Sequence, residues 1–74
     1  MLLSVFSIYD TAVKAWNRPI FARNTGEVLR QFGEAVNDPQ SALNKHPQDF
    51  VLFELGKFDD ATAAFEMLSA RCVS

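Results

Sequence analysis

The segment 50–58 (FVLFELGKF) constrains the fold most, because it is apolar almost without interruption. An apolar run of this length between polar segments predicts a central strand of a sheet that is covered on both faces. A second strand is predicted over residues 2–9 (LLSVFSIY), where β-branched and aromatic side chains are frequent. The chain should therefore be built on a sheet.

The segment 25–37 has the clearest helical pattern in the chain. Its apolar residues recur at helical spacing and form one stripe: Val28, Leu29, Phe32, Ala35 and Val36. Asn24 or Thr25 can cap the free amides at the start of the helix, and Asp38-Pro39 ends it. We expect one main helix over about residues 25–37, packed on one face of the sheet.

The residues between the first strand and the helix predict a hairpin. Asp10 and Thr11 can open a turn, because an Asp side chain accepts hydrogen bonds from the backbone ahead of it. We interpret residues 13–17 as a weaker second strand paired with the first, and residues 20–22 as a further extended stretch. Pro19 has no N–H group, so it ends the second strand or places it at an edge of the sheet.

The second half of the chain predicts a loop and a closing hairpin. Residues 40–49 are polar and should form a loop with one helical turn, while residues 59–62 have the composition of a turn. The segment 63–68 suits either a strand or a short helix, and we favour a strand paired with residues 50–58. The tail from about residue 69 is expected to be frayed.

These elements predict one α+β domain over residues 1–74, in the order β-β-α-β with a final β. The sheet should be small and antiparallel, with three to four strands. A domain of 74 residues buries only about 60% of the surface of its unfolded chain. Because 49% of the residues are hydrophobic, the apolar supply exceeds what one helix on one sheet face covers, and we expect a homodimer.

The charge excludes a basic protein that coats DNA, because the formal net charge is −2. The charges are nevertheless uneven, since basic residues dominate between residues 14 and 30 and acidic residues between 49 and 66. The only cysteine, Cys72, allows no internal disulfide, which fits a reducing cytosol. No segment has the pattern of a signal peptide or a membrane span, so we expect no membrane partner.

The basic segment is the best candidate for a functional site. Single-stranded nucleic acid is bound by cations that contact phosphates and by aromatic rings that stack on bases. If residues 14–18 are extended, Lys14, Trp16 and Arg18 alternate along one face and offer both groups. The alternative is that the aromatic residues belong to the core and the cations protect a sheet edge. The candidate nucleic-acid-binding residues are Lys14, Trp16, Arg18, Phe21, Arg23 and Arg30.

Other polar residues favour structural roles over catalysis. His46 and Asp49 have no evident Ser or Cys nucleophile beside them, and Asp49 should bond loop amides. The carboxylates of Asp10, Glu54, Asp59 and Asp60 lack the spacing of a calcium loop and are more typical of turns. Cys72 has no neighbouring ligand, and no glycine-rich phosphate loop is present. We expect no enzyme activity, cofactor, metal or small-molecule substrate.

An ordered set of short motifs runs through most of the chain. They are Phe6-Ser7-Ile8-Tyr9-Asp10, Arg18-Pro19-Ile20-Phe21, Val36-Asn37-Asp38-Pro39, His46-Pro47-Gln48-Asp49-Phe50, Leu52-Phe53-Glu54-Leu55-Gly56 and Phe58-Asp59-Asp60. In order and spacing they resemble the small nonstructural protein of gokushoviruses, which are single-stranded DNA phages of the microvirus group. That protein is the product of their fifth reading frame. The chain departs from the pattern at Ala63, where a Gly is frequent, and in its shorter tail.

The resemblance implies a protein of the host cytoplasm that is absent from the virion. It further implies a role in viral DNA replication, at the switch toward single-stranded DNA synthesis, and DNA binding. It transfers no catalytic or binding residue to this chain. Two functions therefore stay open: an accessory protein that binds single-stranded DNA or replication proteins, and an interaction module that acts on a host or viral protein without nucleic acid.

Overall fold

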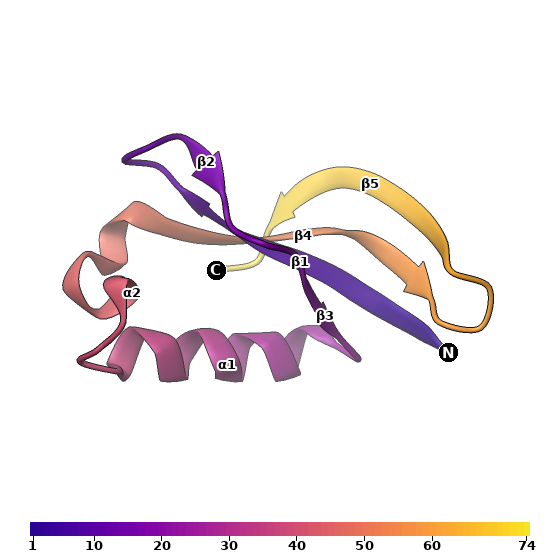
Figure 1. The fold of residues 1–74 in the computed structure, drawn as a ribbon, viewed down its shortest axis with the longest axis horizontal. Helices are drawn as coiled ribbons and strands as arrows, with labels where there is room; N and C mark the ends of the chain where they lie inside the picture. Colours follow the sequence, from indigo (N-terminus) through magenta and orange to yellow (C-terminus); the bar gives the residue numbers. More distant parts are fainter.

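Two long strands pair antiparallel along the middle of the molecule, β1 (Leu2–Asp10) and β4 (Phe50–Asp59) (Figure 1). In this computed structural model, which describes residues 1–74, the ladder runs from Leu2 opposite Asp59 to Asp10 opposite Phe50. The outer side of β4 pairs with β5 (Ala64–Cys72). The prediction of a small α+β fold with a central strand over residues 50–58 is confirmed.

The other edge of the sheet is formed by two short strands, which are separated by a segment that contains a proline. Both β2 (Ala15–Trp16) and β3 (Ile20–Ala22) pair with the free side of β1. Residues 17–19 between them leave the ladder after the Asn17 N–H donates to the carbonyl oxygen of Ile8 at 2.8 Å. Pro19 has no N–H group to continue the pairing, as expected for a proline at a sheet edge.

The second strand is shorter than the predicted segment 13–17. Lys14 has a φ of 58°, in the left-handed region, and belongs to the turn rather than to β2. The turn is fixed by Asp10, whose Oδ1 accepts a hydrogen bond from the Ala12 N–H at 2.9 Å. This local bond was expected from the sequence, but the length of the turn was not.

The main helix, α1 (Thr25–Asn37), has the predicted bounds and the predicted cap. The Asn24 side chain accepts a hydrogen bond from the Glu27 N–H at 2.9 Å. In Figure 1, α1 lies below the ribbon formed by β1 and β4, whereas β2 and β5 lie above it. The buried core between helix and sheet consists of Phe6, Ile8, Ala22, Val28, Leu43 and Leu52.

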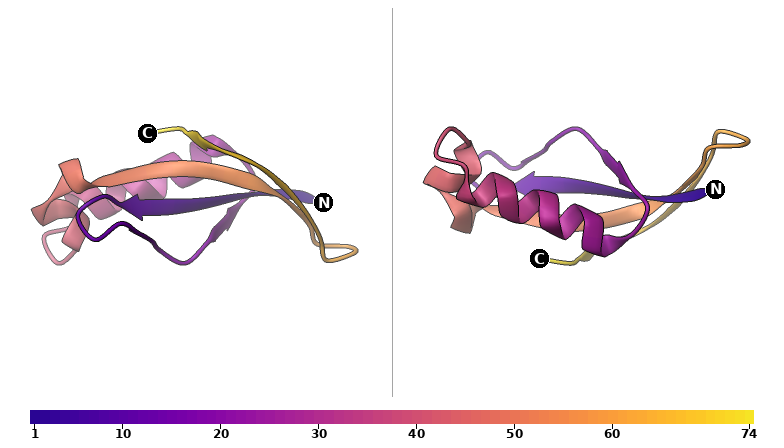
Figure 2. Two further views of the ribbon diagram at one scale, coloured as in Figure 1. Left: turned by 90° about the horizontal axis from the view of Figure 1, so that it is seen from above. Right: turned by 90° about the horizontal axis from the view of Figure 1, so that it is seen from below.

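Residues 40–49 are more ordered than the predicted loop. They contain a short helix, α2 (Ala42–Lys45), and a 3₁₀ turn, η1 (Pro47–Asp49), which close one end of the core (Figure 2). The carbonyl oxygen of Asp49 accepts hydrogen bonds from the Thr11 N–H at 2.8 Å and from the Thr11 hydroxyl at 3.0 Å. The backbone of Asp49, rather than its side chain, thus ties this segment to β1. No helix of the chain is long and apolar enough to cross a membrane.

The segment after residue 63 forms a strand, as favoured from the sequence, but this strand is longer than expected. β5 extends to Cys72, so residues 69–72 are paired instead of frayed. Beyond it, the Val73 N–H donates to the carbonyl oxygen of Leu52 at 2.9 Å, and the Leu52 N–H donates to that of Ser74 at 3.0 Å. This pairing was missed from the sequence, because the partner of the tail on β4 cannot be recognised from a local pattern.

Two irregularities in β4 bend the sheet. β4 has one extra residue, Leu55, relative to β1, because Val5 lies opposite Gly56 and Phe6 opposite Glu54. A Cβ atom on Gly56 would lie 2.3 Å from the carbonyl oxygen of Glu66 on β5, which is closer than any real contact. Glycine is therefore required where β5 passes over β4.

A buried carboxylate lies on the side of the sheet that faces α1. Glu54 is 7% exposed and accepts hydrogen bonds from Arg71 and from Lys57, the latter at 3.3 Å. Burial by itself raises the pKa of Glu54, but the bonds from Arg71 and Lys57 outweigh it and hold the pKa below its ordinary value of 4.5. Because the group binds protons less readily in the folded state, its contribution to stability is present at neutral pH and is lost as the pH falls through the lowered pKa.

We predict that Gly56→Ala destabilises the fold by about 1–3 kcal/mol, because the new methyl group displaces the β5 backbone. The midpoint of urea unfolding measures the change. The matched control is Gly33→Ala in α1, where an added Cβ meets nothing within 4 Å and should stabilise by about 0.5–1 kcal/mol. A Gly56→Ala protein as stable as the control would contradict the close approach of β5.

We predict that Glu54→Gln lowers the free energy of unfolding at pH 7 by about 1.5–3 kcal/mol, because charge-assisted bonds to Arg71 and Lys57 are weakened. The free energy of unfolding of the variant should also decrease less than that of the wild type as the pH falls below the ordinary carboxyl pKa. Urea unfolding at neutral and acidic pH measures both effects. Glu34→Gln is the control, because its exposed ion pair with Arg30 on α1 contributes little to stability. Equal pH dependence in wild type and Glu54→Gln would refute the role of the carboxylate.

Candidate nucleic-acid interface

The face of the sheet opposite α1 carries a first group of aromatic rings around Trp16. Trp16 on β2 lies beside Tyr9 on β1, with ring centroids 4.7 Å apart. Its ring also lies edge-on to the ring of Phe53 on β4, with centroids 5.1 Å apart, across the small buried side chain of Ser7. The hydroxyl of Ser7 donates to the carbonyl oxygen of Asn17 at 2.7 Å, which holds the segment after β2 against the sheet.

A second aromatic group lies on the same face, toward the other end of β1. Phe21 on β3 contacts Phe58 on β4, and Phe58 contacts Phe65 on β5, with centroid distances of 5.3 and 4.7 Å. Both groups share this face because Phe21 is opposite Val5 in the β1 ladder, and Val5 and Tyr9 lie on the same side of β1. The two groups are about 13 Å apart along β1, given about 3.3 Å per residue.

Each of these rings packs against a neighbouring ring on one side and is partly exposed to solvent on the other. The exposed fractions are 48% for Trp16, 44% for Phe21 and 55% for Phe65. No helix covers this face, so β4 is covered on one face only, contrary to the prediction from its continuous apolar run. Trp16 and Phe21 therefore lie in surface clusters and outside the buried core.

The structure divides the predicted cations into two sets. Lys14 in the β1–β2 turn and Arg18 in the gap between β2 and β3 are exposed and form no ion pair. Arg23, in contrast, pairs with Glu27 at 3.2 Å, and Arg30 pairs with Glu34 at 3.5 Å on α1. The predicted alternating ridge of Lys14, Trp16 and Arg18 on one extended strand is not formed, because only Trp16 is in a strand.

Sequence reasoning missed the aromatic residues that β1, β4 and β5 add to this face: Tyr9, Phe53, Phe58 and Phe65. Phe53 and Phe58 are five positions apart, so strict alternation would place them on opposite faces. The extra residue in β4 reverses the alternation between them and brings both to the same face. Nothing in the local pattern marks that bulge except the glycine at position 56.

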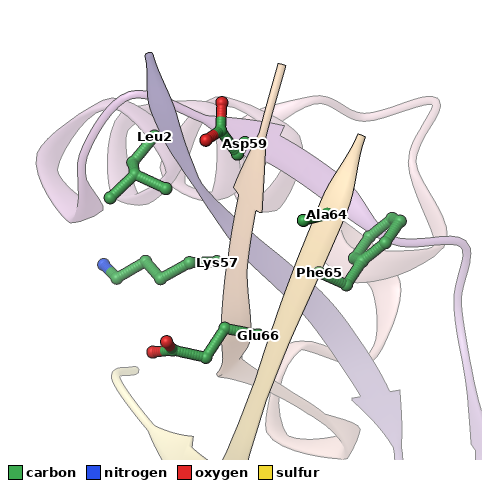
Figure 3. A pocket seen from close by; sticks show the side chains of 6 residues that line it. All are labelled: Leu2, Lys57, Asp59, Ala64, Phe65 and Glu66. Carbon is green, nitrogen blue, oxygen red and sulfur yellow. The ribbon is translucent and has the colours of Figure 1, made fainter. Parts of the chain in front are cut away.

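A small pocket of about 270 Å³ lies near the β4–β5 hairpin, between Leu2, Lys57, Asp59, Ala64, Phe65 and Glu66 (Figure 3). Lys57 and Glu66 point to one side of the strands and Phe65 to the other. The Lys57 amine is already bonded to Ser4 Oγ at 3.0 Å and to Glu54. The pocket thus offers no free cation for a ligand.

The predicted acidic candidates do not gather into one site. Asp10 caps a turn at one end of β1, whereas Asp59 and Asp60 lie at the other end, where Asp60 accepts a hydrogen bond from the N-terminal amine at 2.9 Å. No three His, Cys, Asp or Glu side chains come together as metal ligands. Cys72 is exposed and free.

Comparison with known proteins identifies the family. The searches of curated proteins and of solved structures gave no match. The family model described as Phage ORF5 protein matches residues 3–73, nearly the whole chain. This match agrees with the resemblance to the fifth-reading-frame product of gokushoviruses. With residues 3–73 matched, the chain belongs to the Phage ORF5 protein family.

Proposed function

We propose that this phage protein is a nonstructural accessory protein of DNA replication, which binds single-stranded DNA modestly through the sheet face opposite α1. The observation that carries the proposal is the pair of half-exposed aromatic groups on that face, around Trp16 and Phe21. Single-stranded DNA binding commonly uses exposed rings, because every base has a π-face that can stack on them. It also needs cations beside the rings, and Lys14 and Arg18 flank Trp16 in the sequence.

The charge distribution limits the affinity. Two free cations near the rings correspond to two phosphate contacts, for which the slope of log K against log salt is about −1.4 on single strands. The formal net charge of −2 opposes association at longer range. Stacking should therefore supply most of the binding free energy, and the sequence preference should be weak.

The proposed role follows from the family and from the binding chemistry together. We place the protein in the host cytoplasm and outside the virion, at the stage at which viral single-stranded DNA is synthesised. No nucleophile–base pair supports catalysis, so we infer that the protein acts by binding alone and not as an enzyme. Covering exposed single strands, or delivering them to replication proteins, would suit a small protein with a modest affinity.

A second candidate function is protein–protein interaction without nucleic acid. It is favoured by β5, an edge strand in which every residue is exposed, and by the acidic balance of the chain. The two functions differ in one observable. A partner captured from infected cells that stays bound after nuclease treatment supports protein contact, whereas release by nuclease supports DNA.

We predict that Trp16→Ala weakens binding of a labelled oligonucleotide by about 5- to 150-fold, because loss of one stacking ring costs about 1–3 kcal/mol. Fluorescence anisotropy at low salt measures the affinity. Trp16→Phe keeps a ring and serves as the matched control. Since Trp16 is the only tryptophan, quenching of its emission by unlabelled DNA gives an independent signal. Absence of both binding and quenching at low salt would exclude the DNA function.

We predict that Arg18→Ala weakens DNA binding and makes the slope of log K against log salt shallower, by the equivalent of about one phosphate contact. Arg30→Ala should change neither the affinity nor the slope. Arg30 is paired with Glu34 on α1, on the far side of the sheet from the aromatic rings. Anisotropy titrations at several salt concentrations measure both slopes. Equal losses from the two variants would show that DNA is attracted by general charge and not by this face.

A further inference from the structure

The two edges of the sheet are protected to different degrees. The edge formed by β2 and β3 is interrupted at residues 17–19 and contains Pro19, which prevents continuous pairing with another strand. The opposite edge is β5, nine residues long and without proline. Alternate N–H and C=O groups of an edge strand point away from the sheet and remain free to pair.

Three of the exposed side chains of β5 are large and apolar. Phe65, Met67 and Leu68 are 55%, 60% and 49% exposed, although they lie within a nine-residue strand. β5 contacts β4 but packs against no helix (Figure 1). A strand of this kind is a template for pairing with a second strand.

The two charged residues of β5 have opposite signs and lie on the same face. Glu66 is opposite Lys57 of β4, and Arg71 is opposite Glu54, which places both on the side of the sheet that faces α1. In a regular strand, residues 66 and 71 would point to opposite faces. The bulge in β5 between Met67 and Arg71 shifts the alternation, so that both side chains point to the same face.

We infer that a second copy of this chain pairs with β5 along its free edge, antiparallel about a two-fold axis, with Glu66 of each copy opposite Arg71 of the other. In this register residues 64–67 of one copy face residues 70–73 of the second copy, and the two bulges meet at the axis. The symmetric registers centred on residue 66 or on residue 71 would set Glu66 against Glu66 or Arg71 against Arg71, and like charges directly opposite are destabilising. Arg71 has five N–H donors, enough to bind its own Glu54 and the second Glu66.

The two-fold axis is perpendicular to the sheet, so both copies of α1 lie on one side and both aromatic faces on the other. The pairing rests on β5 alone and does not depend on DNA binding. Where both hold, the two aromatic faces form one longer surface. Failure of the pairing would appear in the oligomeric state, whereas failure of the DNA function would appear in the anisotropy titration.

The register is tested by disulfide cross-linking with the native Cys72. In the paired dimer Phe65 is opposite Cys72 of the second copy, and directly opposite residues have Cα atoms about 4.5–5.5 Å apart, within the range for a disulfide. Phe65→Cys should give a covalent dimer under mild oxidation, reversed by a reductant. A bond within one chain is excluded, because the β4 partners Phe58 and Phe53 are about 16 Å apart along the strand.

The matched control is Ala64→Cys, whose side chain would point to the other face of the sheet, as Ala64 is opposite Asp59. This variant and the wild type should stay free of covalent dimer. No covalent dimer from Phe65→Cys, or the same yield from Ala64→Cys, would overturn the register.

The non-covalent dimer is tested by sedimentation of the wild type over a range of concentrations. Glu66→Arg should raise the dimer dissociation constant by about tenfold or more, because two attractive pairs become repulsive. Glu34→Arg changes the charge equally on α1 and should leave it unchanged. A wild type that is monomeric at every concentration, or equal effects of the two substitutions, would overturn the proposal.

Discussion

The antiparallel ladder between β1 and β4 is the interaction on which the rest of the structure depends. It joins two segments that are forty or more residues apart and provides the surface on which α1 packs. β2 and β3 are added beside β1, and β5 is added beside β4. The extra residue in β4 and the glycine after it bend the ladder, so that β5 passes close over the β4 backbone.

The two faces of this ladder have different uses. One face is closed by α1 and α2 over a core that includes Phe6, Val28 and Leu52. The chain has a single long helix, so the other face is left with aromatic side chains that cover one another and remain partly exposed. An apolar surface of this kind on a small domain is typical of a binding surface. One helix therefore covers one face of the sheet and leaves the other partly exposed, as the proposed binding function requires.

Ion pairing decides which cations remain available. Arg23 and Arg30 are held by acids of α1, and Lys57 and Arg71 by the buried Glu54. Lys14 and Arg18, beside Trp16, stay unpaired. The proposed DNA binding therefore depends on these two local cations, although the protein as a whole is acidic.

The sequence by itself determined the elements whose signals are local. These are the helix from 25 to 37 with its Asn24 cap, the Asp10 turn, and the strands around residues 2–10 and 50–59. Only the tertiary structure decided which face Phe53 and Phe58 share, where β2 ends, which cations are paired, and that residues 69–72 form a strand. Helix caps and turns depend on atoms within four residues of each other, whereas register, bulges and ion pairs depend on partners distant in the chain, which no local pattern specifies.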